Sequence, residues 1–211
     1  MNKEGLLLII SGPSGSGKGT VTRRLPEDVF ALSISMTTRR KRGEEVDGKH
    51  YIFCTEEEFV KVRDEGGLLE HASFSGNFYG TPVSYVKQKT LEGKNVVLEI
   101  EVVGALQVKE KYPEAVLIFL MPPTILELRK RLKDRGTESE DEIERRLRIA
   151  HEEMAELPKY DYLVINDDIE QALADIHAIV NVEGLKPFRG KCKVDGFYGN
   201  NVNSSSPTYF A

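Results

Sequence analysis

The chain of 211 residues contains no tryptophan and only two cysteines, Cys54 and Cys192. Two thiols can neither build a disulfide framework nor supply the four ligands of a structural zinc site, so a reducing compartment is expected. Long apolar runs are also missing, since the longest one near the N-terminus spans only residues 6–10. A signal peptide needs an apolar segment of roughly 7–15 residues and a membrane helix about 20. These absences predict a cytoplasmic protein that is not inserted in a membrane.

Positive charge is also in short supply, because 29 Lys and Arg stand against 34 Asp and Glu, which gives a net charge of −5. Proteins that coat nucleic acid are usually basic, so this balance argues against such a role. The net negative charge is still compatible with a local basic cluster that holds a small polyanion. With 40% hydrophobic and 30% charged residues, the chain has the composition of a globular protein. Its length favours one compact unit with insertions.

Four short apolar runs are typical of buried strands in a parallel sheet; they span residues 6–10, 95–100, 115–120 and 162–165. Helical stretches separate them, and several open with an N-cap residue followed three positions later by Glu or Gln. These pairs are Thr55 with Glu58, Thr124 with Glu127, Ser139 with Glu142, and Asp168 with Gln171. Buried strands that alternate with capped helices predict an α/β fold with a parallel central sheet covered on both faces.

Three segments depart from this alternation. Residues 35–85 are polar, glycine-rich and aromatic, with only short strand-like runs, which predicts an inserted subdomain. Residues 129–148 carry eight Lys or Arg and six Asp or Glu. From residue 186 onward the chain is rich in Gly, Asn and Ser, which is typical of a loose, flexible tail.

A phosphate-binding pattern, G-x-x-x-x-G-K, follows the first predicted strand and precedes a predicted helix over residues 20–25. It consists of Gly12, Pro13, Ser14, Gly15, Ser16, Gly17, Lys18, Gly19 and Thr20. The glycines allow successive backbone N–H groups to point at an anion, and the lysine supplies a charge for the terminal phosphates. The alternative is a plain glycine-rich turn, which the lysine in register and the flanking elements disfavour.

The pattern departs from the usual one at Gly19, where a Ser or Thr hydroxyl normally binds Mg²⁺. Phosphates and water are therefore expected to hold the metal, with the hydroxyl of Thr20 nearby. The protein is therefore expected to use Mg²⁺ as a cofactor.

A run of four cations, residues 39–42, lies soon after the phosphate loop and is either a solvated loop or a second anion site. The wider pattern decides between them, because its order and spacing resemble those of guanylate kinases over about residues 4–184. The matching segments are residues 12–20, 35–42, 48–51, 69–72, 76–81, 131–136, 146–147 and 164–168.

The resemblance implies a P-loop NTPase fold with three layers, a GMP-binding insertion and a helical lid. In this chain the domain would span residues 1–185, with a core of 4–34, 86–128 and 150–185. The insertion would span 35–85 and the lid 129–149, followed by the tail of 186–211. The implied reaction transfers the γ-phosphoryl group of ATP to GMP, or to dGMP, and yields ADP and GDP by in-line transfer.

The resemblance also implies which residues bind GMP: Ser35, Arg39, Arg42, Tyr51, Glu70, Tyr79, Thr81 and Glu101. Guanine presents N–H donors at N1 and N2 beside the O6 acceptor, and the carboxylate of Glu70 would accept from both donors. A site built for these groups leaves them unpaired with adenine. Without the family, Glu70 would be taken for a surface carboxylate.

On the ATP side, the resemblance implies catalytic roles for Lys18, Arg42, Arg135 and Arg146, and places Arg135 and Asn166 beside ATP. Arginines stabilise the charge of a migrating phosphoryl group. The plainer alternative is that lid arginines pair along their helices, Glu127 with Arg131 and Glu142 with Arg146.

Two acidic positions depart from the family, which has Asp where Glu99 and Glu101 stand; Val103 also replaces a Gln. The resemblance assigns Glu99 to ordering metal-bound water and Glu101 to guanine. Strand alternation would place both carboxylates on one side of the strand. Each extra methylene moves a carboxylate by roughly 1.5 Å. We therefore expect Asp at both positions to leave activity equal or higher.

Two other functions stay open at this point. One is a guanylate-kinase-like interaction module that binds peptides and has lost catalysis, which the intact phosphate loop and lid arginines disfavour. The other is a kinase of the same fold with a different small acceptor. Nucleic acid and membrane are not expected partners, and the protein would be a monomer or a homodimer.

Overall fold

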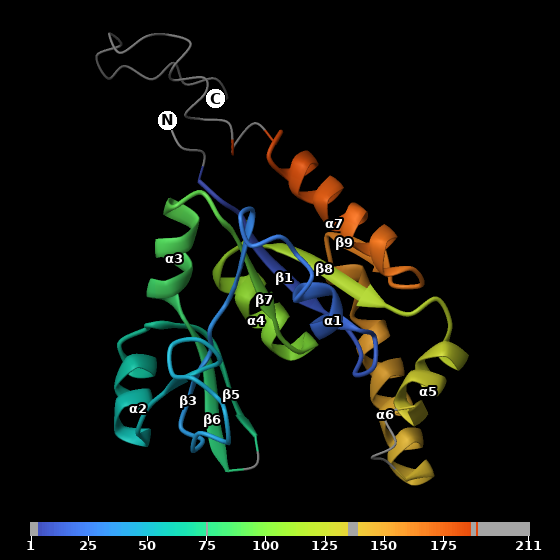
Figure 1. Cartoon of the computed structure of the whole chain (residues 1–211), viewed down its shortest axis with the longest axis horizontal. Helices are drawn as coiled ribbons and strands as arrows, with labels where there is room; N and C mark the ends of the chain where they lie inside the picture. The colour runs from blue at the N-terminus through green and yellow to red at the C-terminus, as the bar shows by residue number, and fades with distance from the viewer. Residues whose placement is uncertain (1–3, 75, 135–138, 187–188, 190–211) are drawn as a thin grey trace, which may run out of the picture.

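The computed structural model describes residues 4–74, 76–134, 139–186 and 189 (Figure 1). Its centre is a parallel sheet of five strands in the order β2-β7-β1-β8-β9. The strands are β1 (Leu7–Ser11), β2 (Phe30–Leu32), β7 (Asn95–Glu99), β8 (Val116–Met121) and β9 (Tyr162–Ile165). The four predicted strands are confirmed, and β2 is a fifth strand.

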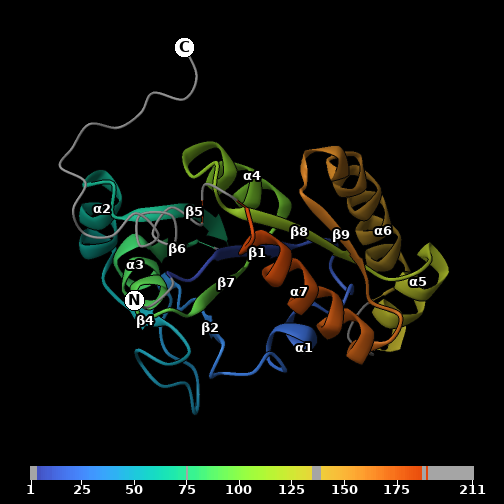
Figure 2. The same cartoon turned by 90° about the horizontal axis from the view of Figure 1, so that it is seen from above.

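Alternate residues of the strands pack on opposite faces of this sheet, which gives three layers. Leu8 and Ile10 of β1 contribute to a core with helices α1 (Lys18–Thr22) and α7 (Ile169–Glu183). Ile9 between them belongs to a second core, which includes residues of α3 (Val83–Leu91) and α4 (Val102–Lys111). Figure 2 shows α4 on one face of the sheet and α1 with α7 on the other. The α/β prediction with both faces covered is confirmed.

A second sheet of four strands, ordered β4-β3-β6-β5, lies beside the central one (Figure 1). Its strands are β3 (Met36–Thr37), β4 (Ile52–Phe53), β5 (Leu68–Phe74) and β6 (Asn77–Pro82), with helix α2 (Glu56–Asp64). The prediction of only short strands holds for β3 and β4. It was wrong for β5 and β6, which form an antiparallel hairpin with a register shift between Leu68 and His71. Its polar residues break the apolar runs that identify a strand in the sequence.

Two helices, α5 (Ile125–Asp134) and α6 (Glu140–Ala155), lie on the side of the central sheet away from the smaller sheet (Figure 1). A 3₁₀ turn at Leu157–Lys159 follows them. Leu128 and Leu132 of α5 bury against Ile143 and Ala150 of α6 in a small core of their own. This separate core allows the pair to pack as a unit. Helix α6 continues without a break past residue 149, where the predicted lid ends.

The predicted helix starts are confirmed as N-caps. Thr55 and Glu58 form a reciprocal capping box, and Ser139 and Asp168 accept from the backbone of the residue three positions on. The Glu127 N–H donates to the Thr124 hydroxyl at 3.1 Å. The predicted helix over residues 20–25 starts earlier, at Lys18, because the phosphate loop leads directly into it.

Two residues near the start of the predicted loose tail, Lys186 and Arg189, contact the domain. The buried carboxylate of Glu183, at the end of α7, pairs with Lys186 at 2.6 Å and with Arg189 at 3.2 Å. All other residues of 186–211 lie outside the described part. Among the described residues, every helix is too short or too polar to cross a bilayer.

Candidate active site

The phosphate loop connects β1, the central strand, to α1. Gly12, Gly15 and Gly17 have φ values of 139°, 91° and 94°, in the left-handed region that L side chains rarely adopt. A Cβ at Gly12 would lie 2.1 Å from the Leu120 carbonyl oxygen of β8. Gly12, Gly15 and Gly17 are thus required by the turn, and Gly12 also by its contact with the sheet.

Lys18 opens α1, and its ammonium group donates to the carbonyl oxygens of Gly12 and, at 3.2 Å, of Pro13. Its neighbours include a carboxylate that sequence reasoning missed, Glu153 of α6. Burial raises the pKa of Glu153, Lys18 opposes that rise, and Glu101 adds to it. The Glu153 carboxylate therefore lies close enough to both Lys18 and Glu101 to be affected by their charges.

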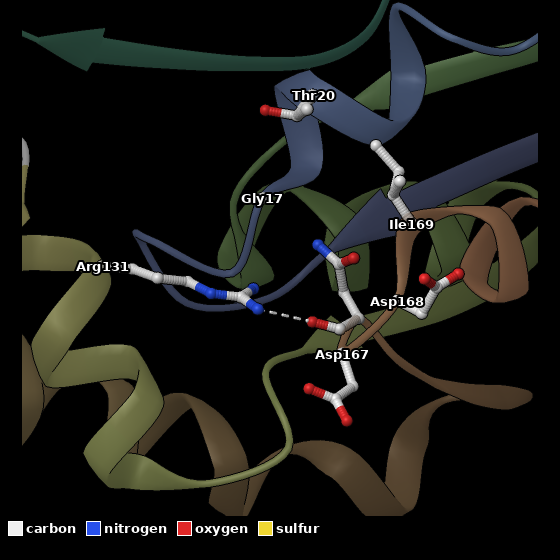
Figure 3. A pocket seen from close by; sticks show the side chains of 7 residues that line it. Gly17, Thr20, Arg131, Asp167, Asp168 and Ile169 are labelled. Atoms are coloured by element: carbon white, nitrogen blue, oxygen red, sulfur yellow. Dashed lines mark hydrogen bonds between the residues drawn. The ribbon is translucent and has the colours of Figure 1, made fainter.

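A cavity of about 400 Å³ opens beside the loop and is lined by Gly17, Thr20, Arg131 and residues 166–169 (Figure 3). Asn166 is buried there, and its side-chain amide donates to the Ser16 carbonyl oxygen at 2.8 Å. Arg131 reaches from α5 and donates to the Asn166 carbonyl oxygen at 2.9 Å (Figure 3). Asn166 thus holds the phosphate loop as well as lining the cavity, a contact that its predicted role beside ATP did not include.

The helix pair places one of the two predicted lid arginines on the phosphate loop, since Arg146 donates to the Ser14 hydroxyl at 2.7 Å. Arg135 lies outside the described residues. Glu127 pairs with Arg131 at 2.8 Å, as helix spacing predicts. Glu142 accepts from Arg145 at 3.1 Å.

A second group of polar residues gathers on the smaller sheet around Arg39, which is buried. Its guanidinium lies 5.2 Å from the centre of the Tyr51 ring, and the Tyr51 ring lies 6.1 Å from that of Tyr79. Arg39 also forms a bidentate ion pair with Glu45, at 2.7 and 3.0 Å. The structure thus brings the predicted Arg39, Tyr51 and Tyr79 together.

Glu45 is the residue in this group that sequence reasoning missed; the Gly-Glu-Glu stretch of residues 43–45 reads as a minor loop variation. One oxygen of its carboxylate also accepts from the Arg42 backbone N–H at 2.8 Å. The hydrogen bond from Arg39 lowers the pKa of Glu45 to about 2. The side chain therefore stays ionised and fixes Arg39 relative to the loop that carries the exposed Arg42.

Glu70 and Thr81 face each other across the β5–β6 hairpin, with the Thr81 hydroxyl donating to the Glu70 carboxylate at 2.8 Å. Both residues are buried. Burial raises the pKa of Glu70, and the Thr81 hydrogen bond opposes that rise. Glu70 is thus a buried acceptor rather than a surface carboxylate.

A second cavity, of about 290 Å³, is lined both by residues of the central sheet and by residues of the segment that forms the smaller sheet. They are Leu32, Ser33, Ser35, His50, Tyr51, Val97 and Glu99. It combines the predicted Ser35, Tyr51 and Glu99 with His50, which sequence reasoning did not single out. Because Glu99 is the last residue of β7 and β7 lies next to β1, this cavity adjoins the phosphate loop.

The prediction that strand alternation aligns Glu99 and Glu101 was wrong. Strand β7 ends at Glu99, and Glu101 is the N-cap residue of α4, where the chain turns from the sheet into a helix. Glu99 instead accepts a hydrogen bond at 2.9 Å from Thr22 of α1, a further residue that the sequence did not reveal.

A parallel sheet with a phosphate loop after its central strand defines a protein of the P-loop NTPase class. The family model described as guanylate kinase matches residues 4–183. The chain belongs to the guanylate kinase family.

Individual relatives are similar over nearly the whole chain. A guanylate kinase of Caldanaerobacter subterraneus subsp. tengcongensis is 50% identical over 197 residues, which is 92% of each chain. One from Lactococcus lactis subsp. lactis is 51% identical over 185 residues, 87% of this chain and 90% of the relative. The crystal structure of guanylate kinase from Anaplasma phagocytophilum superposes with a TM-score of 0.69 at 34% identity, covering 92% of this chain and 95% of the other.

Proposed function

We propose that this protein transfers the γ-phosphoryl group of ATP to GMP and to dGMP, yielding ADP and GDP or dGDP. The observation that supports the proposal is the second group of polar residues on the smaller sheet, the Arg39 cluster and the buried Glu70. Tyr51 of this cluster shares a cavity with Glu99 of the central sheet. A phosphate loop alone would serve any nucleotide-hydrolysing protein. A buried carboxylate acceptor next to an arginine–tyrosine cluster suits an acceptor that combines a guanine edge with a phosphate.

On the donor side, residues 12–20 cradle the ATP phosphates, and Lys18 moves from the loop carbonyls to the terminal phosphates. Arg146 already contacts the loop at Ser14, so the helix pair α5–α6 can bring its charge to the migrating group. Arg135 is assigned a similar role by its position in the family pattern. Asn166 and Arg131 form the wall of the cavity for the nucleoside.

On the acceptor side, Arg39, Arg42, Tyr51 and Tyr79 bind the GMP phosphate. Glu70 accepts from guanine N1 and N2, while Ser35, Thr81 and Glu101 complete the base site. These assignments include no group that reads the ribose 2′ position, so dGMP serves as well.

Mg²⁺ fits the donor atoms near the loop, which are the exposed hydroxyl of Thr20 and the exposed carboxylate of Glu99. Among the described residues, no group of three or more His, Cys, Asp or Glu could hold a metal on its own. This donor set suits an ion held mainly by phosphates and water. When bound, Mg²⁺ neutralises charge on the transferring phosphates.

The proposal is tested by coupling ADP release to NADH oxidation with GMP, dGMP, AMP, CMP and UMP as acceptors. We expect turnover with GMP and dGMP at least about 100-fold above that with AMP. A protein that turned over none of them would be an interaction module. Faster turnover with a pyrimidine or adenine nucleotide would assign the second site to another acceptor.

Replacing Glu45 by glutamine is expected to raise the KM for GMP by roughly 10- to 100-fold while kcat changes less. The amide keeps the size of the side chain but loses the charge that fixes Arg39 in a bidentate pair and holds the loop at Arg42. Glutamine at the neighbouring exposed Glu44 is the matched control, with KM expected to stay unchanged. Equal KM values for the two variants would remove Glu45 from the phosphate site.

A further inference from the structure

Gly19 has no backbone reason to be glycine. Gly12, Gly15 and Gly17 all have positive φ values, whereas Gly19 lies within the right-handed helix α1 and shows no such angle. A Ser or Thr at this place would adopt the same backbone without strain. The missing side chain must therefore be explained by what surrounds it.

The space beside Gly19 is filled by the ends of two charged side chains, the Arg23 guanidinium and the Glu99 carboxylate. A Cβ at this position would lie 3.3 Å from Oε1 of Glu99 and 3.0 Å from Nη1 of Arg23. Both distances are tighter than most contacts of real Cβ atoms, so a side chain here would displace the ends of these two residues. Glu99 thus brings a carboxylate oxygen, and Arg23 a guanidinium, to the place where a side chain at residue 19 would begin.

Thr22, one turn further along α1, holds the carboxylate in this place. Its hydroxyl donates to Oε2 of Glu99 at 2.9 Å, and its side chain is buried at 1% exposure. With Oε2 fixed by Thr22, the other oxygen, Oε1, is the one beside Gly19. An aspartate would be shorter by one carbon–carbon bond, about 1.5 Å, and would not reach both points.

We propose that Gly19, Thr22 and Glu99 form one matched unit, in which Glu99, held by the positioning residue Thr22, replaces the missing residue-19 hydroxyl as the oxygen that orders the water around nucleotide-bound Mg²⁺. The inference rests on the proposed function. It also reverses the expectation that aspartate at position 99 would be neutral or beneficial, because the reach of glutamate is what the absent side chain at Gly19 accommodates.

The test measures how much Mg²⁺ tightens ATP binding, as the ratio of dissociation constants from calorimetry without and with the metal, in the absence of GMP. Glu99→Asp and Thr22→Val are expected to reduce this ratio by about tenfold, since groups that orient metal-site ligands typically contribute 10- to 100-fold. Thr22→Ser keeps the hydroxyl and is expected to keep the ratio. Gly19→Ser combined with Glu99→Asp is expected to recover most of it, because the new hydroxyl occupies the space that the shorter acid vacates.

An unchanged ratio in both Glu99→Asp and Thr22→Val would overturn the proposal, as would a double variant no better than Glu99→Asp alone. Because Glu99 is exposed, Glu99→Asp is expected to fold and to give a measurable ratio even if a change at the buried Thr22 impairs folding. The acceptor assay on the unmodified protein tests the proposed function separately, because the calorimetric ratio requires no GMP.

Discussion

Replacement of Lys18 by alanine is expected to lower kcat for phosphoryl transfer by about 100- to 1000-fold or more, the loss typical of removing one group that stabilises transition-state charge. Lys18 is the cation at the head of α1 and stands on the carbonyl oxygens of Gly12 and Pro13 within the phosphate loop. Its removal leaves the glycine backbone of the loop in place. ATP binding is therefore expected to weaken less than kcat falls.

Lys94 supplies a matched control for this change. It is a lysine of comparable, intermediate exposure, and its ammonium group also donates to two backbone carbonyl oxygens, those of Glu27 and Asp28. It directly precedes β7 and so lies at the amino ends of the parallel strands, whereas the phosphate loop follows the carboxyl end of β1. Lys94→Ala should cost about as much stability as Lys18→Ala and leave kcat unchanged.

Steady-state kinetics and thermal unfolding of the two variants separate the catalytic role of Lys18 from the structural role that both lysines have. Losing such contacts is expected to lower Tm by no more than about 4 °C in either variant, since 1 kcal/mol corresponds to roughly 2–4 °C for a domain of this size. If Lys18→Ala kept wild-type kcat, or if Lys94→Ala lost as much, the catalytic role of Lys18 would have to be abandoned.

The central sheet was predictable because its strands are buried on both faces. The run that becomes β8, Val116–Met121, is almost wholly apolar and could not lie at a surface. The β5–β6 hairpin escaped the same reasoning because its strands include polar side chains such as Glu70 and Thr81. Those two residues bind each other across the hairpin, which carries both of them into the proposed acceptor site.

The site residues divide in a similar way. Glycines and Lys18 follow from the local pattern, because a phosphate loop is one continuous segment. Glu45 and Thr22 were missed because their roles arise only when separate segments meet, Glu45 with Arg39 through a closed loop and Thr22 with Glu99 through the adjacency of α1 and β7. Only an observed contact could have identified them.

Glutamine in place of Glu70 is expected to lower kcat/KM for GMP by roughly 100-fold or more, while turnover with AMP does not fall. The Glu70 carboxylate would accept two hydrogen bonds from guanine, and bonds to charged groups contribute about 1.5–3 kcal/mol each. An amide retains one acceptor and presents a donor to the guanine N–H groups. Selectivity, measured as the ratio of kcat/KM values for GMP and AMP, therefore collapses without a change in side-chain size.

Glu183 is the matched control for this variant, since it is also buried but lies at the end of α7, where it binds Tyr162 at 2.7 Å and Lys186. Burial raises the pKa of Glu70. Burial also opposes ionisation of Glu183, but its partners Lys186, Tyr162 and Arg189 outweigh burial and lower its pKa. Ionisation of Glu70 therefore opposes folding at neutral pH, whereas ionisation of Glu183 favours it.

The two glutamine variants should consequently differ in opposite ways in Tm and in selectivity for GMP. At pH 7, Glu70→Gln is expected to keep or raise Tm and lose selectivity, and Glu183→Gln to lower Tm and keep selectivity. Because the Glu70 pKa is raised, its destabilising contribution is absent below the pKa of an unfolded glutamate and develops as pH rises through the folded value. The Tm advantage of Glu70→Gln should thus shrink on acidification, while kcat/KM of the wild type for GMP falls as the carboxylate takes up its proton. Retained selectivity in Glu70→Gln would show that another group reads the guanine edge.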